Sequence, residues 1–311
     1  MKILYMTPHI YNSAGTERVL SMKVNYLVQH AGYDIVIVTT DQKEKKNFFD
    51  FDSRIKHYDL GLNYEDDFGK NIISKTLLHY RKNHVYKKRL AKIIKIENPD
   101  VCISMFGKEL EFICNMNLSC KIAAELHFNQ RLRHDVLMAN HHGWLWEQIG
   151  KFRTRQMIRE TKGLDSLVVL TKEDMEQWQK TNNNICQVYN PLHYESNEGA
   201  TLNDKTIISV GRLSPQKNYS SLIRAWKLVH QKHADWQLKI WGDGELKEQL
   251  QEEIQEQSVE QSCHLCGRTD NVSKEYLHSS AYVMSSAFEG FPMVLLAAAS
   301  FGLPLISYAV F

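Results

Sequence analysis

Strand-like and helix-like segments alternate along almost the whole chain, and this alternation is the feature that most restricts its fold. Buried strands are short, continuous apolar runs rich in β-branched residues. In the first half such runs lie at residues 2–6, 34–40, 101–105, 121–126 and 166–171. Apolar residues recur at helical spacing from Leu20 to Ala31, and Gly32 is a plausible helix end. Strands that alternate with helices predict a parallel sheet with helices on both faces.

The alternation stops in a polar stretch at residues 189–205 and then restarts. The later strand-like runs lie at residues 206–211, 237–242, 263–267, 281–286 and 303–310. Amphipathic helices are expected at 220–231 and 245–256. We therefore predict an α/β protein of two tandem Rossmann-like domains, residues 1–192 and 193–311. The site is expected in the cleft between them, at the carboxyl ends of strands.

The composition is that of a soluble globular protein, with 43% hydrophobic and 24% charged residues. A net charge of +2 gives no indication of a nucleic-acid partner. The six cysteines form no framework, which is typical of a reducing compartment, so we expect a cytoplasmic protein. The first apolar run is too short for a signal peptide.

No charged residue occurs between Gly290 and Phe311, a stretch long enough to span a bilayer. However, Gly302 and Pro304 would interrupt such a helix. The small residues and the turn favour a buried helix-turn-strand unit instead.

The motif "VGRLSPQKN" places Arg212 and Lys217 after a strand that ends at Gly211 and before a helix. Cations beside a helix N-terminus suit a diphosphate, but a solvated basic loop explains the same residues equally well. In "WGDGELKEQL", Lys247 stands where a dinucleotide fingerprint needs its third glycine, so we interpret this motif as a strand-to-helix turn.

Glu289 precedes Gly290, Phe291 and Pro292, and proline favours the first turn of a helix. Backbone amides at that helix start would suit a phosphate, and the carboxylate would accept hydrogen bonds from sugar hydroxyls. Alternatively, Glu289 is a surface acid that the helix dipole stabilises.

These motifs, in the order "GRL…QKN", "GDGE", "GR" and "FEGFPMVLL", resemble the C-terminal half of a family 4 glycosyltransferase of the GT-B fold. "AGTERV" and "ELHF" are similar to the N-terminal half of that family, more weakly. The resemblance implies transfer of a sugar from a nucleotide sugar to an acceptor with retention of anomeric configuration, without a metal or other cofactor. A UDP-sugar is the first expectation for the donor and a GDP-sugar the second. The acceptor would be a saccharide or a lipid-linked saccharide in polysaccharide biosynthesis.

The same resemblance assigns roles to individual residues. It implies that Arg212 and Lys217 bind the diphosphate, that Glu289 binds the donor sugar, and that His127 contacts the sugar during transfer. These four are the expected catalytic residues. The expected donor-binding set is Gly15, Gly211, Arg212, Lys217, Arg268, Glu289, Gly290, Phe291, Pro292 and Ala297.

The chain departs from the family at two places. The family pairs its first acid with a second glutamate eight positions on, which binds the ribose, whereas this chain has Ala297 there. We expect Ala297→Glu to tighten donor binding; the alternative is that Ala297 is a packed helix residue. The family also continues beyond the position of Phe311, so the second domain is expected to be incomplete.

Other patterns carry less weight. Asp50 and Asp52 match a metal-binding D-x-D but lie in a polar segment, which favours a loop. Cys263 and Cys266 have no second pair, which favours an ordinary strand over zinc. The basic run 81–95 is either a solvated face or a peripheral contact with anionic lipid at the inner face of a membrane. Alternatives to a retaining hexosyltransferase are a degraded, non-catalytic nucleotide-sugar-binding protein and a nucleotide-sugar epimerase.

Overall fold

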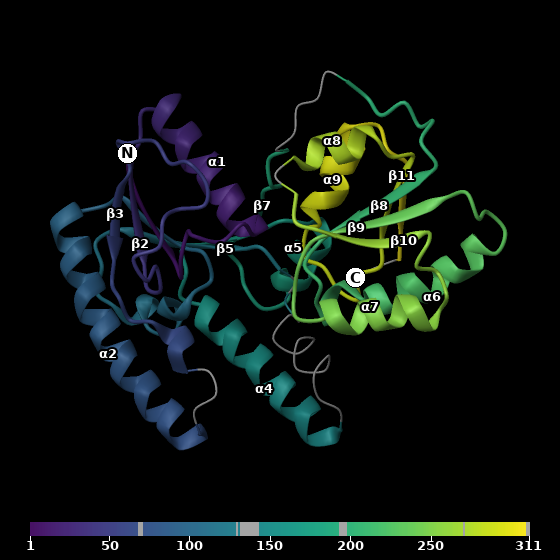
Figure 1. The fold of residues 1–311 in the computed structure, drawn as a ribbon. Helices are drawn as coiled ribbons and strands as arrows, with labels where there is room; N and C mark the ends of the chain where they lie inside the picture. The colour runs from purple at the N-terminus through teal and green to yellow at the C-terminus, as the bar shows by residue number, and fades with distance from the viewer. Residues whose placement is uncertain (68–70, 129, 131–142, 193–197, 270, 309–311) are drawn as a thin grey trace. The chain divides into compact units, whose positions relative to one another are not determined.

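The computed structural model describes residues 1–311 except 68–70, 129, 131–142, 193–197, 270 and 309–311. The chain divides into two compact units (Figure 1). The first comprises Met1–Arg131 and Lys151–Asn190, and the second comprises Leu132–Gly150 and Pro191–Phe311. Each unit contains its own parallel sheet, so the predicted α/β architecture of two Rossmann-like domains is confirmed.

The sheet of the first unit has the strand order β3-β2-β1-β4-β5-β6-β7, with every neighbouring pair parallel. Its strands are β1 (Lys2–Thr7), β2 (Asp34–Thr39), β3 (Lys56–Asp59), β4 (Val101–Ser104), β5 (Lys121–Leu126), β6 (Ser166–Val169) and β7 (Ile185–Gln187). The α-helices in this half of the chain are α1 (Gly15–Gln29), α2 (Ile72–Glu97), α4 (Trp144–Thr161) and α5 (Lys172–Gln179). Short 3₁₀ turns are η1 (Tyr64–Asp67), η2 (Lys108–Glu111) and η3 (Ile113–Asn115).

Both faces of this sheet are covered. Successive residues of a strand point to opposite faces, and β1 distributes its side chains accordingly. Leu4 and Met6 belong to one buried cluster, and Ile3 and Tyr5 belong to another. The near-continuous burial of β1 explains why it is an unbroken apolar run in the sequence.

The sheet of the second unit has the order β10-β9-β8-β11-β12 and is also parallel. Its strands are β8 (Thr206–Val210), β9 (Gln237–Trp241), β10 (Cys263–Gly267), β11 (Ala281–Met284) and β12 (Leu305–Ser307). Its helices are α6 (Tyr219–His230), α7 (Lys247–Glu256), α8 (Val272–Leu277) and α9 (Met293–Ser300), with a 3₁₀ turn η4 at Pro215–Lys217. Leu238 and Ile240 lie in one core cluster and Ile208 and Tyr282 in another, so this sheet is also covered on both faces.

The uncharged C-terminal stretch forms a helix, a turn and a strand, as predicted. Phe301 and Leu303 are 2% and 4% exposed. The expectation that the whole stretch is buried is wrong for β12, where Leu305 and Ile306 are 44% and 51% exposed. This strand pairs with β11 on one side only, at the end of the sheet order. Among the residues described, no helix combines the length and the apolar character needed to cross a bilayer.

Candidate functional site at the carboxyl ends of the strands

The loops that follow β8 and β11 meet in the second unit because these strands are parallel neighbours in its sheet. Lys217 ends η4, after β8, and Glu289 follows β11. The Lys217 Nζ lies 2.6 Å from Glu289 Oε1, and the side chains are 17% and 10% exposed. The structure therefore brings together two residues predicted for the donor site, as a largely buried ion pair.

Further contacts dock the two loops on each other. The backbone N–H of Ala287 donates to the Gln216 carbonyl at 2.8 Å. The Ser285 hydroxyl donates to the Lys217 carbonyl, also at 2.8 Å. The Gln216 amide donates to the Phe288 carbonyl at 3.1 Å and to Glu289 Oε2 at 3.4 Å. The sequence analysis missed Gln216 and Ser285, because neither residue type signals chemistry without its neighbours.

Glycines allow the loops after β8 and β9 to touch through their backbones. A Cβ at Gly242, which has φ +148°, would lie 1.8 Å from the Gly211 carbonyl oxygen. A Cβ at Gly244 would lie 2.4 Å from the Leu213 carbonyl oxygen. At Gly211 itself, a Cβ would lie 2.8 Å from the Tyr219 hydroxyl. The "GDG" sequence is thus a strand-to-helix turn, as predicted, and its glycines serve close packing of two loops.

Arg212 and Arg268 lie on the same edge of the sheet but do not join the Lys217 pair. The Arg212 guanidinium is 3.2 Å from Glu245 Oε2, and its side chain is 74% exposed. Arg268, which follows β10, lies 4.0 Å from Asp243 Oδ2 and is equally exposed. Both guanidinium groups are therefore held by acids of the β9–α7 loop and remain accessible to a ligand.

Gly290, Phe291 and Pro292 form the turn before α9 and are partly buried. Pro292 is the N-cap of α9, with no side-chain cap, and the helix begins at Met293. Ala297 lies on α9 at 4% exposure, in the apolar cluster that includes Tyr276, Tyr282 and Phe301. This burial favours the interpretation of Ala297 as a packed helix residue over that of a vacated ribose contact.

In the first unit, His127 follows β5, and its side chain is 8% exposed. Its Nε2 lies 3.5 Å from Glu125 Oε2, and Lys23 of α1 forms an ion pair with the same carboxylate. Burial would raise the pKa of Glu125, but His127 and Lys23 outweigh burial and lower it to about 2. The sequence analysis predicted His127 but not its two charged neighbours. Gly15, at the start of α1, is exposed, with no atom within 4 Å of the position of a Cβ.

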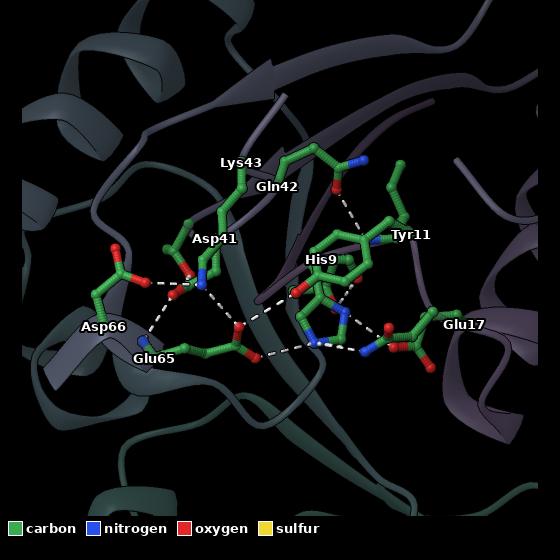
Figure 2. Close-up of polar contacts among 12 residues, drawn as sticks. His9, Tyr11, Glu17, Asp41, Gln42, Lys43, Glu65 and Asp66 are labelled. Carbon is green, nitrogen blue, oxygen red and sulfur yellow. Dashed lines mark hydrogen bonds and ion pairs between the residues drawn. The ribbon is translucent and has the colours of Figure 1, made fainter. Parts of the chain in front are cut away.

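A second polar cluster, which the sequence analysis missed, joins the loops after β1 and β2 with η1 (Figure 2). His9 lies between two glutamates, with Nδ1 3.1 Å from Glu17 Oε1 and Nε2 3.6 Å from Glu65 Oε1. Glu65 also accepts a hydrogen bond from the Tyr11 hydroxyl at 3.2 Å and pairs with Lys43 at 3.2 Å. Burial would lower the pKa of His9, but Glu17, Glu65 and Asp41 together raise it above its ordinary value.

Within the described part of the chain, no group of three or more His, Cys, Asp or Glu side chains is arranged to hold a metal ion. Cys263 and Cys266 lie on β10, and residues 50–52 lie outside any helix or strand, both as predicted.

Comparisons with known proteins agree with this architecture. The family model described as "Glycosyl transferases group 1" matches residues 194–311. An uncharacterized glycosyltransferase of Haemophilus influenzae is 30% identical over 313 residues, which cover 99% of this chain and 80% of that protein. The N-acetylgalactosamine-N,N'-diacetylbacillosaminyl-diphospho-undecaprenol 4-alpha-N-acetylgalactosaminyltransferase of Campylobacter jejuni is 35% identical over 130 residues, 40% of this chain and 35% of that protein.

Among solved structures, S. aureus TarM in complex with Fondaparinux, alpha-GlcNAc-glycerol and UDP superposes with a TM-score of 0.75 at 14% identity. The match covers 99% of this chain and 86% of that one. At this identity the likeness shows the shared fold, which is that of the GT-B glycosyltransferases.

Proposed function

The chain belongs to the glycosyltransferases, and we propose that it transfers a hexose from a UDP-sugar to a saccharide or lipid-linked saccharide with retention of configuration. The observation that carries the proposal is the Lys217–Glu289 pair at the carboxyl edge of the second sheet. A cation for a diphosphate and a carboxylate for sugar hydroxyls are the two groups that a nucleotide sugar requires side by side.

Each donor contact has a chemical role in this proposal. Arg212 and Lys217 bind the diphosphate, with Arg268 at the same edge and the backbone amides of the turn 290–292 as further donors. Glu289 accepts hydrogen bonds from the donor sugar. Negative charge accumulates on the diphosphate as the glycosidic bond breaks, and the fixed cations and amides stabilise it without a metal ion.

Retention is proposed through attack on the face that the leaving group occupies. The acceptor hydroxyl forms the new bond to the anomeric carbon as the bond to the diphosphate breaks. The leaving phosphate oxygen takes the proton of that hydroxyl, so no protein nucleophile is required. His127 is proposed to contact the donor sugar during this step, with Gly15 leaving space for the donor at the first loop.

The acceptor is proposed to reach the protein from a membrane surface. The Campylobacter relative is named for a diphospho-undecaprenol acceptor. In this chain, α2 contains one acid, Glu97, which is buried and paired with Lys2 and Lys56. Its basic residues Lys88 and Lys92 are exposed. A basic helix of this kind suits anionic headgroups, and we propose peripheral attachment at the cytoplasmic face.

The test is to incubate the protein with UDP-sugars and GDP-sugars, with and without acceptor, and to follow nucleoside diphosphate release and sugar identity. Acceptor-dependent release of UDP is expected. Conversion of the donor sugar without release would indicate an epimerase, and binding without turnover would indicate a non-catalytic binding protein.

Arg212→Ala and Lys217→Ala test the assignment of the diphosphate site. Each should weaken UDP binding by about 1.5–3 kcal/mol, the usual contribution of a charge-assisted contact. Lys232→Ala, which removes an exposed lysine beyond α6, is the matched control. Wild-type affinity for UDP in both site variants would contradict the assignment.

A further inference from the structure

Two consecutive residues of the loop after β8 occupy both carboxylate oxygens of Glu289. Lys217 lies 2.6 Å from Oε1, and the Gln216 amide lies 3.4 Å from Oε2. The same Gln216 nitrogen donates to the Phe288 carbonyl at 3.1 Å, so it holds the backbone of this loop as well as its side chain.

The backbones of the two loops fix this arrangement. The Ala287 N–H donates to the Gln216 carbonyl, and the Ser285 hydroxyl donates to the Lys217 carbonyl. These contacts lie at the end of two paired strands, β8 and β11. The Glu289 side chain is 10% exposed, so neighbouring protein groups, and not solvent, set its orientation.

We propose that Gln216 is a positioning residue for recognition of the donor sugar. It fixes the carboxylate of Glu289 so that the remaining lone pairs of that carboxylate accept the sugar hydroxyls. This inference rests on the proposed function, in which Glu289 binds the sugar. An ionised carboxylate offers about four acceptor sites, and the two protein donors occupy two of them. A preset carboxylate binds hydroxyls with less loss of side-chain entropy than a free one.

The residue type at position 216 follows from this role. An amide donates a hydrogen bond to a carboxylate and adds no charge, so it orients Glu289 without competing with Lys217. A glutamate would place a second negative charge beside Glu289. A methionine would retain the length of the side chain but would donate no hydrogen bond.

The test separates sugar recognition from nucleotide binding. Calorimetry on the wild-type protein with UDP-glucose, UDP-galactose, UDP-N-acetylglucosamine and GDP-mannose identifies the best donor. Gln216→Met and Gln216→Glu are then titrated with that donor and with its nucleoside diphosphate alone. Gln216→Met should weaken binding of the nucleotide sugar about tenfold, the effect of one hydrogen bond to a charged group, and Gln216→Glu should weaken it more. Affinity for the diphosphate should change less than twofold, and the melting temperature should not change.

Gln249→Met, on the exposed surface of α7, is the matched control and should leave both affinities unchanged. In a double-mutant cycle, Gln216→Met should have almost no further effect once Glu289→Gln is present, because the two residues act as one unit. An equal loss of affinity for diphosphate and nucleotide sugar would show a structural role, and no loss for either would remove Gln216 from the site. Absence of any nucleotide or nucleotide-sugar binding by the wild-type protein would overturn the proposed function, and this inference with it.

Discussion

At the scale of single residues, Ala297 separates what family resemblance suggests from what packing permits. The side chain is 4% exposed among aromatic and aliphatic residues. Ala297→Glu would bury a carboxylate without a partner, so we now expect the free energy of unfolding to fall by about 2–4 kcal/mol. Ala299→Glu, on the exposed side of the same helix, is the control and should cost less than about 1 kcal/mol. Urea denaturation measures both. An unchanged stability together with tighter donor binding would restore the ribose-site interpretation.

His9 predicts a pH dependence of stability in the first unit. Its folded-state pKa is raised, against the effect of burial, by Glu17, Glu65 and Asp41. A raised folded pKa means that protonated His9 stabilises the fold. This stabilisation is complete below the unfolded pKa of about 6.5 and disappears as the pH rises through the folded value.

The difference in unfolding free energy between wild type and His9→Gln should therefore narrow from pH 6 to pH 9, measured by urea denaturation. Glu65→Gln should reduce this pH dependence, whereas Glu44→Gln, an exposed acid in the loop after β2, is the control. A constant difference across the range would show that His9 contributes packing only.

Resemblance allowed Lys217 and Glu289 to be predicted from sequence, because both residue types stand at fixed positions in recognisable motifs. Gln216 and His9 could not be predicted in this way. Gln216 functions only through a loop that lies about 70 positions further along the chain. His9 gains its charged neighbours from α1 and η1, and the polar loop that contains it has no periodicity.

At the scale of elements, the packed turn after β9 gives a sharp test. Gly242→Ala would place a Cβ against the Gly211 carbonyl at a φ that disfavours side chains. The free energy of unfolding should fall by about 2–5 kcal/mol, from overpacking and backbone strain together. Gly302→Ala is the matched control, because Gly302 has φ +75° but no atom within 4 Å of the Cβ position. That variant should lose only about 1–2 kcal/mol. Equal losses in thermal or urea unfolding would show that loop contact adds nothing to the strain.

Helix α2 carries the prediction of membrane attachment. Lys88→Glu combined with Lys92→Glu should weaken binding to phosphatidylserine-containing vesicles by about tenfold or more, since each basic residue near such a surface contributes about 1 kcal/mol. Lys172→Glu combined with Lys180→Glu, exposed positions on and just beyond α5, makes the same change of charge elsewhere. Vesicle sedimentation at physiological salt distinguishes the pairs. Equal losses would indicate that net charge, and not α2, determines the attraction.

Strands that the sequence analysis missed are those that packing across the sheet defines. β3 is polar and largely exposed, and β7 has three residues. Neither shows an apolar run, and β3 forms because β2 offers it a parallel partner. The buried strands β1 and β2 were predicted almost to the residue, since burial on both faces requires continuous apolar sequence.

At the scale of the whole molecule, topology was the most predictable property. Parallel strands need crossover connections, and alternating strand and helix patterns supply them. The two strand orders follow from repeating that rule on either side of a polar stretch. The alternation alone did not predict which loops would meet, because the contact between the loops after β8 and β11 depends on strand order and not on chain order.

The division into two compact units gives the last prediction. Lys217 and Glu289 both belong to the second unit. A ligand that binds only the folded state of one unit stabilises that unit by mass action, by about 2.7 kcal/mol at one hundred times its Kd. Saturating UDP should therefore slow amide hydrogen exchange in residues 211–217 and 285–293 and leave α2 in the first unit unchanged. Mass spectrometry of peptides after exchange measures this directly, and UMP, which lacks the β-phosphate, is the matched ligand control. With UMP the protection at 211–217 should be weaker, because Arg212 and Lys217 are proposed to bind the diphosphate. Protection concentrated in the first unit, or equal protection by UMP and UDP at 211–217, would show that the nucleotide binds elsewhere.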